Sequence, residues 1–260
     1  MIRIEELKIK PKIIFTDIDD TITDDGLLHA NSYSSMWKLF EHNFRIVPVT
    51  GRPAGWCEMI ARLWPVHGVI GENGGFYFRY DRDQKSMKRK FYFDTPQQAL
   101  NRNKLDIIKA QILKEVPGSD VASDQFTRLM DLAIDFCEDV QPLDKAAIDK
   151  IVQIFISHGA QAKVSSIHVN GWFGDYDKLK MVKTYLNDEF NLDLEKAQRD
   201  ILFCGDSPND EPMFAAFENS VAVANIKKFV NDLKHLPHYV CSQTGGKGFS
   251  ELANHLLTLT

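Results

Sequence analysis

The stretch IIFTDIDDT, residues 13–21, joins a short apolar run to a dense group of carboxylates. Its first residues, Ile13 to Phe15, are typical of a buried strand, because β-branched and aromatic side chains pack well on a pleated surface. Asp17 and Asp19 lie two positions apart, so they can project to the same side at the carboxyl end of that strand, where open α/β sheets place their ligand sites. Two carboxylates this close repel each other unless a cation or a shared proton relieves them. The stretch therefore predicts a strand that carries an acidic site to one edge of a sheet, although an isolated pattern of this kind also suits a solvated turn.

Strands and helices alternate on both sides of this stretch. Apolar runs of strand type are separated by segments with helical periodicity, which predicts a parallel sheet with helices on its faces. The expected elements are, in chain order, a strand at 13–15, a helix at 32–42, a strand at 46–49, a helix at 54–64, a strand at 68–70, a helix at 179–190, a strand at 201–204, a short helix after 209, a strand at 221–223, a helix at 227–235, a strand at 239–240 and a helix from 249. The expected fold class is α/β, with a doubly wound, Rossmann-like parallel sheet that the chain leaves and later rejoins.

The segment between these two halves has a different pattern. Its expected elements are, in chain order, an antiparallel hairpin at 76–93 with a charged turn at 81–90, a helix that begins at about 95, a strand at 127–136, a helix around 148–155 and a strand at 163–170. Thr95-Pro96-Gln97-Gln98 offers a helix N-cap, then a proline at the first helical position and a glutamine at the third. We therefore expect a core made of residues 1–93 and 172–260, with an inserted α+β cap domain at 94–171.

The composition excludes several classes of protein. The chain has 260 residues, 44% of them hydrophobic and 26% charged, which is typical of a globular protein. A net charge of −5 disfavours a general nucleic-acid binder and binding to acidic membrane lipids, because both usually need a basic surplus. No apolar run approaches the ~18 residues of a membrane span, and residues 1–12 are too charged for a secretory signal. The 4 cysteines form no CxxC pair, so we expect reduced thiols in a cytoplasmic protein. Its oligomeric state is expected to be a monomer or a homodimer.

Polar residues also follow two other strands of the expected sheet. Thr50, Gly51 and Arg52 come directly after the strand at 46–49, and a hydroxyl beside a flexible glycine at a strand-to-helix turn suits an anion. The run Gly205-Asp206-Ser207-Pro208-Asn209-Asp210 follows the strand at 201–204. Its carboxylates would either cap the next helix or join the first pair around a divalent metal. An all-oxygen set without clustered His or Cys favours Mg²⁺ as that metal.

Lys178 stands at the start of the helix that returns to the core. A lysine at a helix N-terminus is electrostatically misplaced for stability, because cations favour the C-terminus. Lys178 is therefore a candidate for a role in the site, whereas Lys180 and Lys183 are expected to be solvated.

Together these four patterns resemble the motifs of the haloacid dehalogenase superfamily of phosphohydrolases. The matching positions are Asp17 to Thr21, Thr50, Lys178 and Asp206 to Asp210. Further resemblance to subfamily IIB, which has a large cap after the second motif and includes Cof-type, sucrose-phosphate and mannosyl-phosphoglycerate phosphatases, lies in Glu72-Asn73-Gly74-Gly75, in Val221-Ala222-Val223-Ala224-Asn225 and in Gly246-Lys247-Gly248. The sequence departs from the family at Asp20, where the family often has glycine.

The resemblance implies a Mg²⁺-dependent phosphomonoester hydrolase that works through an aspartyl-phosphate. Asp17 would be the nucleophile, and Asp19 would protonate the leaving oxygen and later deprotonate water. Mg²⁺ would be held by Asp17, the backbone carbonyl of Asp19 and Asp206, with Asp210 in a supporting position. The residues that would hold the other phosphate oxygens are Thr50, Gly51, Lys178 and Asn209.

The polar face of the cap sheet is the guide to the substrate, which we expect to be a small hydroxylated metabolite, most simply a sugar or polyol phosphate. The candidates for recognising its leaving group are Asp131, Ser166, His168 and Asn170. Arg52 and Arg128 are candidates for a second anionic group. The alternative is that this face is polar only because exposed sheet faces usually are.

Two other functions share parts of the pattern. A phosphomannomutase-like phosphotransferase has the same cap type and first motif, but its last motif differs from GDSPND at 205–210. A non-enzymatic phosphoacceptor signalling domain also combines Asp, Mg²⁺, Thr and Lys, yet it places its acceptor after a later strand and needs no inserted domain. A dinucleotide-binding protein is disfavoured because no GxGxxG opens the first helix.

Overall fold

A parallel sheet forms the centre of the larger part of the molecule. The structure is a computed structural model and describes residues 1–165 and 167–259. The sheet has the order β1-β13-β12-β11-β2-β3, and every neighbouring pair is parallel. Its strands are β1 (Ile2–Arg3), β2 (Ile13–Thr16), β3 (Arg45–Pro48), β11 (Ile201–Gly205), β12 (Ser220–Ala222) and β13 (Tyr239–Val240). The predicted parallel sheet is confirmed, and the N-terminal residues add β1 at its edge.

Alternating side chains of β2 supply both apolar layers of the core. Ile14 belongs to one buried cluster, and Ile13 and Phe15 belong to the other. The first cluster includes side chains of α1 (Ala30–Glu41), α2 (Ala54–Leu63) and α7 (Gly245–Thr258), and the second includes side chains of α5 (Lys178–Phe190) and α6 (Glu211–Ala216). Because a strand buried on both faces is apolar throughout, the sheet is wound on both sides by helices.

A three-stranded extension continues the core beyond β3. It has the order β4-β5-β6 and consists of β4 (Val69–Gly71), β5 (Phe76–Asp81) and β6 (Ser86–Phe91). A parallel bridge between Val49 and Ile70 joins it to the end of the main sheet. The prediction of a charged turn over 81–90 was wrong, since residues 86–90 pair with β5. β6 is an edge strand, and this exposure lets its charged side chains stay in water.

The cap is an α+β unit, formed by the elements from α3 to β10. Its antiparallel sheet has the order β7-β8-β10-β9. The elements are α3 (Thr95–Glu115), β7 (Asp120–Val121), β8 (Asp131–Asp135), α4 (Lys145–Ser157), β9 (Gln161–Val164) and β10 (His168–Trp172). Leu132, Ile134 and Val169 pack under α3 and α4 in an apolar cluster separate from the two of the core. The opposite face of this sheet carries the polar side chains.

Three expectations for the cap differ from the structure. The strand expected at 163–170 is a hairpin, because β9 ends at Val164 and β10 begins at His168, with Ser165 bonding the backbone of His168 in the turn. The strand expected at 127–136 is shorter and follows a 3₁₀ turn at Gln125–Thr127. The N-cap of α3 is Asp94, whose carboxylate accepts a hydrogen bond from Gln97 N at 3.0 Å, so the helix starts one residue before the predicted position.

Two expectations for the core differ as well. The helix expected at 227–235 is instead a 3₁₀ segment at Ala224–Phe229, in which Ala224 and Ile226 are the buried residues. The final helix begins at Gly245 and not at 249. Glycine disfavours helices, which hid this start, but a side chain at Gly246 would collide with Ser32. The close approach of α7 to α1 therefore requires the glycine.

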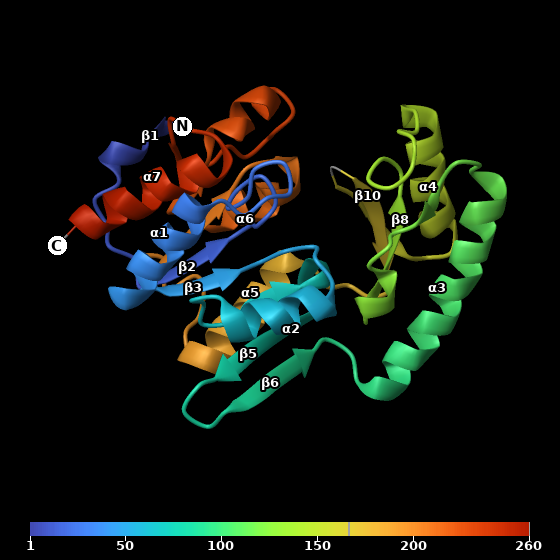
Figure 1. Ribbon diagram of the computed structural model, residues 1–260, viewed down its shortest axis with the longest axis horizontal. Helices are drawn as coiled ribbons and strands as arrows, with labels where there is room; N and C mark the ends of the chain where they lie inside the picture. The colour runs from blue at the N-terminus through green and yellow to red at the C-terminus, as the bar shows by residue number, and fades with distance from the viewer. Residues whose placement is uncertain (166, 260) are drawn as a thin grey trace.

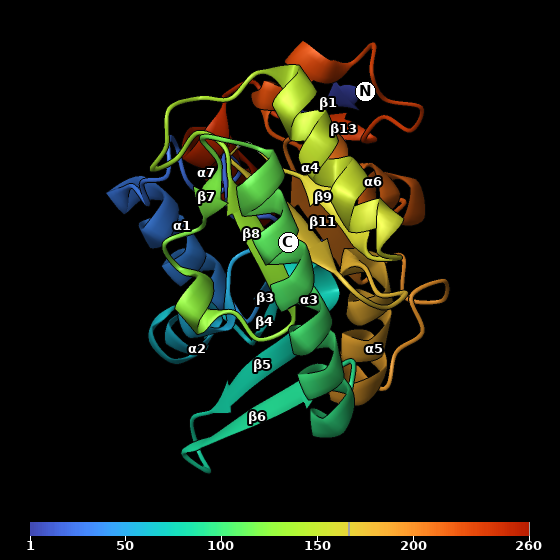
Figure 2. The same ribbon diagram turned by 90° about the vertical axis from the view of Figure 1, so that its right-hand side faces the viewer.

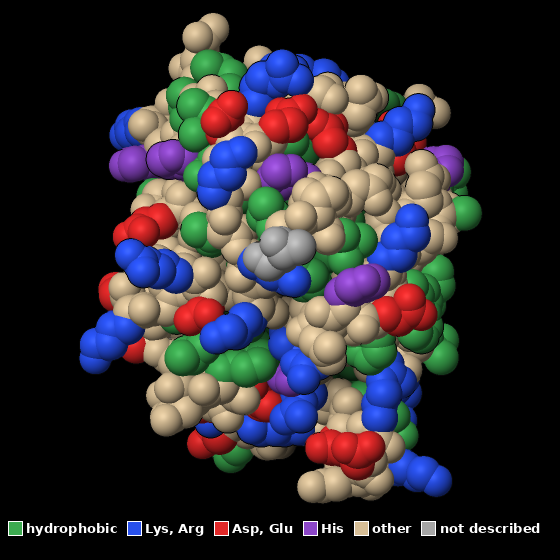
Figure 3. Space-filling view, turned by 90° about the vertical axis from the view of Figure 1, so that its left-hand side faces the viewer, with side chains coloured by type: hydrophobic (Ala, Val, Ile, Leu, Met, Phe, Trp, Pro, Cys, Tyr) green, Lys and Arg blue, Asp and Glu red, His purple; other side chains and the backbone are tan. Residues whose placement is uncertain are grey.

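The cap stands beside the core with α3 and α4 on its outer side and β8 and β10 towards the core (Figure 1). The same two helices cover the viewer's side when the molecule is turned by 90° (Figure 2). On the core face that points away from the cap, acidic and basic side chains are intermixed (Figure 3). Within residues 1–165 and 167–259, no helix has the length and apolar character required to cross a membrane.

Candidate active site

The carboxyl ends of β2, β3 and β11 meet at the edge of the core sheet that faces the cap. Asp17 N donates to Cys204 O at 2.9 Å, and Val49 N donates to Thr16 O at 2.8 Å, which keeps the three strand ends in register. A cavity of about 430 Å³ lies between this edge and the cap. The predicted site residues that line it are Asp17, Asp19, Gly51, Arg52, Arg128, His168, Asn170, Lys178, Asp206 and Asn209. Four segments far apart in sequence are thus brought together at one place.

Lys178 links the first and last motifs on the floor of this cavity. Its ammonium donates to Asp17 Oδ1 at 2.6 Å and to Asp210 Oδ1 at 3.0 Å, and all three side chains are buried. Burial alone would lower the pKa of Lys178, but the two carboxylates raise it above its usual value. These two anions explain how a buried lysine is tolerated at the N-terminus of α5, where the helix dipole disfavours it.

Both carboxylate oxygens of Asp210 are occupied by protein groups. Oδ1 accepts from Lys178, and Oδ2 accepts from the backbone N–H of Asp206 at 3.2 Å. Gly205 leaves the space for this arrangement, because a side chain there would overlap the Asp210 carboxylate. Asp210 therefore holds Lys178 and the Asp206 backbone in place.

The acidic groups of the site fit a divalent cation. Oxygen atoms of Asp17, Asp206 and Asp210 all lie within 4.8 Å of one another. Burial, together with the charges of the neighbouring carboxylates, raises the pKa of Asp17 and of Asp206, while Lys178 opposes the change at Asp17. One lysine cannot offset three buried carboxylates, and oxygen ligands are those that Mg²⁺ prefers. The donor set is therefore suitable for Mg²⁺.

Asp19 is turned towards Arg52 rather than towards Lys178. Arg52 Nη2 lies 2.7 Å from Asp19 Oδ1, and Arg52 Nε lies 3.1 Å and 3.2 Å from the two carboxylate oxygens. The guanidinium also stacks over Trp56, with 4.6 Å between its central carbon and the ring centroid. Arg52, predicted as a contact for a second anionic group, is thus already neutralised by an aspartate of the site itself.

Asp20, the departure from the family pattern, has a positive φ of 56°. This left-handed conformation favours glycine, but Asp and Asn tolerate it better than other side chains do. The backbone of the loop is therefore compatible with the family's glycine, and Asp20 adds a carboxylate to the lining of the cavity.

Thr50, Gly51 and Asn209 surround the same space. The Thr50 hydroxyl accepts from Arg52 N at 3.0 Å, so its own proton remains available for donation. Gly51 lies close to Asn73, whose amide would be only 3.3 Å from a β-carbon at position 51. The side-chain oxygen of Asn209 is buried, and no hydrogen-bond partner for it is present among the described residues. Thr50 is fully buried behind the cavity wall, whereas Gly51 and Asn209 line the cavity.

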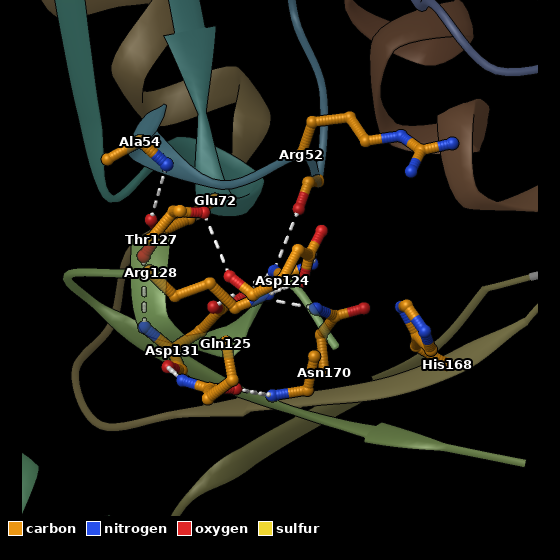
Figure 4. A network of polar contacts seen from close by, with 12 residues as sticks. Arg52, Ala54, Glu72, Asp124, Gln125, Thr127, Arg128, Asp131, His168 and Asn170 are labelled. Atoms are coloured by element: carbon orange, nitrogen blue, oxygen red, sulfur yellow. Dashed lines mark hydrogen bonds and ion pairs between the residues drawn. The ribbon is translucent and has the colours of Figure 1, made fainter. Parts of the chain in front are cut away.

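Some polar side chains on the inner face of the cap bond to one another, and others are exposed to the cavity. The Asp131 carboxylate is fully buried and accepts from Arg128 and from Asn170 Nδ2, so its hydrogen bonds are satisfied within the cap (Figure 4). His168 lines the cavity, and its Nε2 lies 2.9 Å from Glu138 Oε2. Ser166, also predicted here, lies outside the described residues. Arg128 pairs with Asp124 and Asp131, which neutralise it as Asp19 neutralises Arg52.

Glu72 connects the core to the cap, a role that the sequence did not indicate. Its buried carboxylate accepts backbone N–H groups of Ala54 in α2 and of Leu129, Met130 and Asp131 in the cap (Figure 4). Its φ is 43°, within a short left-handed run that includes Asn73 and Gly74. Arg128 Nη1 adds a second link, since it donates to Gly51 O at 3.1 Å. The ENGG run at 72–75 was the available signal, because positive φ values often mark functional turns.

Lys163 is the second residue that sequence reasoning missed. It lies in β9 directly opposite Asn170 of β10, so the two side chains share the face that looks into the cavity. Its ammonium donates to Asn209 O at 2.7 Å, across the gap between cap and core. Treating 163–170 as a single strand concealed this pairing, which depends on the hairpin turn.

Comparisons with known proteins agree with this geometry. The family model of sucrose-6F-phosphate phosphohydrolases matches residues 177–256. A phosphoglycolate phosphatase of Methanobrevibacter smithii is 28% identical over 251 residues, which cover 92% of this chain and 95% of that protein. A crystal structure from Thermoplasma acidophilum has a TM-score of 0.74 at 19% identity and covers 95% of this chain and 98% of its own. The sucrose-phosphatase of Synechocystis, solved with sucrose and phosphate, has a TM-score of 0.66 at 16% identity, with 96% of this chain and 100% of that chain covered.

These likenesses extend over the core and the cap, and the family match includes the helix that carries Lys178 and the loop with Asp206 and Asp210. The matched region thus contains two of the four motifs, and the structural likenesses show that the fold around them is shared. In sequence and in fold the chain is thus similar to phosphatases of the haloacid dehalogenase type.

Proposed function

We propose that this protein is a Mg²⁺-dependent phosphomonoester hydrolase that acts on a small metabolite through an aspartyl-phosphate intermediate. The observation that carries the proposal is the position of the Asp17 carboxylate, buried at the floor of the cavity and held by Lys178 at 2.6 Å. One Asp17 oxygen is fixed by the lysine, which leaves the other to attack a phosphorus atom placed above it. A carboxylate nucleophile of this kind divides hydrolysis into two easier displacements.

In the first displacement, an Asp17 oxygen forms a bond to phosphorus while the bond from phosphorus to the ester oxygen breaks. Asp19 donates its proton to the leaving oxygen, so that a neutral alcohol departs. Asp19 must first give up its two-pronged contact with Arg52, because both of its carboxylate oxygens accept hydrogen bonds there. Binding of the substrate is the event that we expect to separate them.

In the second displacement, water attacks the phosphorus of the aspartyl-phosphate. Asp19, now ionised, takes a proton from this water, the bond between phosphorus and the Asp17 oxygen breaks, and inorganic phosphate is released. The regenerated Asp17 carboxylate returns to Lys178. One carboxyl group therefore serves as acid and then as base, as microscopic reversibility requires.

The remaining phosphate oxygens have donors in the same cavity. Lys178 supplies a charged donor, the Gly51 backbone and the Asn209 amide supply neutral donors, and the Thr50 hydroxyl would reach a phosphate oxygen only from behind the cavity wall. Asp210 keeps Lys178 in position from below. Donors fixed in this way before the reaction cost little reorganisation when charge shifts in the transition state.

Asp17, Asp206 and the backbone carbonyl of Asp19 would hold Mg²⁺. When bound, Mg²⁺ supplies positive charge that offsets the repulsion between the Asp17 carboxylate and the phosphate dianion. The support for this metal is the group of buried oxygens described above. Asp206 keeps its position through the Thr21 hydroxyl, 3.4 Å away, and through its own backbone N–H.

The cap, which we assign to residues 94–171, would enclose the leaving group. A cavity of about 430 Å³ suits a small ligand, and a sugar or polyol phosphate is our first expectation. His168 and Asn170 offer polar atoms on the cap side. We place the activity in the cytoplasm, where the buried thiols of Cys57, Cys204 and Cys241 would stay reduced.

A phosphate-release screen tests the proposal. The purified protein is incubated with Mg²⁺ and a panel of sugar phosphates, polyol phosphates, nucleotides, phosphoglycolate and phosphoglycerates, beside Asp17→Asn and beside excess chelator. We expect release from a subset of the panel that both treatments abolish. Release that survives Asp17→Asn or chelation would contradict the mechanism. Transfer of phosphate between hydroxyls without release would instead favour the phosphomannomutase-like alternative.

A further inference from the structure

Five cationic side chains line the cavity, and they differ in how their charge is balanced. They are Arg52, Arg128, Lys163, Lys178 and Lys228. Arg52 pairs with Asp19, Arg128 with Asp124 and Asp131, and Lys178 with Asp17 and Asp210. In the described part of the chain, neither Lys163 nor Lys228 has a carboxylate within ion-pair distance. Lys228 is exposed, so water solvates its charge.

Lys163 is partly buried, and this makes its missing carboxylate significant. Its ammonium contacts a neutral acceptor, Asn209 O, at 2.7 Å. Burial lowers the pKa of Lys163 to about 8, and the charge of Lys178 adds to the effect, although the more distant carboxylates of Asp210 and Asp17 oppose it. A desolvated ammonium without a counter-charge is unfavourable unless an anion reaches it. An anionic ligand in the cavity can therefore supply the counter-charge that the Lys163 ammonium lacks.

Two groups of a bound ester could pair with Lys163: the phosphoryl group, or a negative group on the alcohol part. The direction from which Lys163 enters the cavity distinguishes between them. In an in-line displacement the leaving oxygen lies opposite the nucleophile, so an ester attacked by Asp17 from the core directs its alcohol part to the cap. Lys163 projects from the cap strand β9 into that half of the cavity, beside Asn170. The phosphoryl oxygens already have Lys178 and neutral donors on the core side. A negative group on the alcohol part is thus the anion that Lys163 can reach.

We propose that Lys163 is a specificity-determining residue that binds a carboxylate on the leaving group, so that the preferred substrates are phosphate esters of small hydroxy acids rather than of neutral alcohols. The carboxylate belongs on, or next to, the carbon that bears the phosphate ester, because the Lys163 ammonium lies 2.7 Å from Asn209 O, in the loop that also carries Asp206. This inference rests on the proposed phosphomonoester hydrolase activity, and it replaces the first expectation of a neutral sugar or polyol phosphate with an ester that carries a carboxylate. It transfers to Lys163 the role that the sequence suggested for Arg52 and Arg128, whose charges are already neutralised.

Matched pairs of substrates test the inference. Phosphoglycolate and 2-hydroxyethyl phosphate differ only in a carboxylate that replaces a hydroxymethyl group, and so do 2-phosphoglycerate and glycerol 2-phosphate. We expect the wild-type protein to have the higher kcat/KM for the acid in at least one pair. Lys163→Met should lower the acid-to-alcohol ratio of kcat/KM about 30-fold or more, since the lost contact is a desolvated charge pair.

Two further variants serve as controls. Lys163→Arg keeps the charge and should retain most of the preference for the acid. Lys228→Met removes an exposed cation from the same cavity and should leave the ratio within about 2-fold of wild type, because solvated charges contribute little. Lys163 lies on the edge strand β9, so we expect Lys163→Met to fold, which circular dichroism checks.

The outcomes distinguish this inference from the proposed function. An equal fall for acid and alcohol in Lys163→Met would place Lys163 on the phosphoryl group and overturn the inference. A wild-type preference for the alcohols would overturn it too. In both cases Asp17-dependent phosphate release would still be observed, so the proposed function would stand. Absence of Asp17-dependent release from every ester in the panel would remove the proposed function itself.

Discussion

The core and the cap place their polar residues by different physical means. In the core, each site residue follows a buried strand or begins a helix, so local chain geometry delivers Asp17, Thr50 and Asp206 to one edge of a parallel sheet. In the cap, residues reach the cavity through the register of an antiparallel sheet, as Lys163 does opposite Asn170. Chemistry that depends on strand ends can thus be located in a sequence, whereas specificity that depends on register needs the structure.

The largest effect that we expect is a loss of kcat when Asp19, a site residue of the core, is replaced. Asp19→Asn should lower kcat by about 10²–10⁴-fold, because an amide can neither protonate the leaving oxygen nor deprotonate water. Steady-state phosphate release on the best substrate of the screen measures it. Asp20→Asn is the matched control, since it makes the same change at the next position and asparagine tolerates the positive φ found there. Similar losses in the two variants would mean that the loop's charge, and not Asp19 itself, supports the reaction.

A smaller effect concerns the stability of the acidic floor. Lys178→Met should reduce the free energy of unfolding by about 3–5 kcal/mol without metal, because it leaves Asp17 and Asp210 buried without their cation. Urea unfolding followed by circular dichroism measures the change. Lys180→Met, two positions along α5 at a solvent-accessible lysine, should leave the free energy of unfolding nearly unchanged. Added Mg²⁺ should recover part of the loss at Lys178, and equal losses in both variants would contradict the buried network.

The link between the two regions can be weakened at Glu72. Glu72→Gln should destabilise the protein by about 2–3 kcal/mol, because one acceptor oxygen is replaced by an NH₂ group that faces backbone donors. Hydrogen exchange should accelerate at Leu129 to Asp131 before it changes elsewhere in the cap. Glu58→Gln, at a partly exposed glutamate of α2 that pairs with Arg62 and Arg89, should cost less than about 1 kcal/mol. Unchanged exchange at Leu129 to Asp131 would show that Glu72 does not hold the cap.

The smallest effect lies in the core away from the cavity. Burial lowers the pKa of His67 from 6.5 to about 4, and its Nδ1 lies 2.7 Å from the Tyr185 hydroxyl. The unfolded chain binds the proton more tightly, so stability falls as the pH drops from 6.5 towards 4. His67→Gln should remove about 2 kcal/mol or less of this acid dependence. His42→Gln, at an exposed histidine, should leave the slope unchanged, and an unaltered slope in His67→Gln would contradict the shift.

The sequence predicted the parallel core because its strands are short apolar runs with turn signals at their ends. Asp17, Thr50 and Asp206 could be located for the same reason, and the structure gathers Asp17 and Asp206 with Lys178 around one cavity, with Thr50 buried behind its wall. Element ends were less predictable. The N-cap at Asp94 and the early start of α7 depend on side-chain and interhelical contacts that no local pattern encodes.

The polar face of the cap sheet could be predicted, but the partner of each polar side chain could not. Asp131 has the alternation of a cavity residue, yet Arg128 and Asn170 satisfy it inside the cap. Nothing in the local sequence distinguishes Lys163 from an ordinary solvated lysine, but the pairing of β9 with β10 places its side chain in the lining of the cavity. Glu72 connects segments 57 to 59 positions apart through backbone donors, which carry no sequence signature.

Detection of a phosphorylated Asp17 tests the central claim most directly. The protein is mixed with Mg²⁺ and a ³²P-labelled ester chosen from the screen, quenched in acid during turnover, digested and analysed by mass spectrometry. We predict a phosphoryl group on the peptide that contains Asp17, formed before free phosphate accumulates and absent from Asp17→Asn. A phosphoryl group on another residue, or full-rate turnover by Asp17→Asn, would contradict the assignment of Asp17 as the nucleophile.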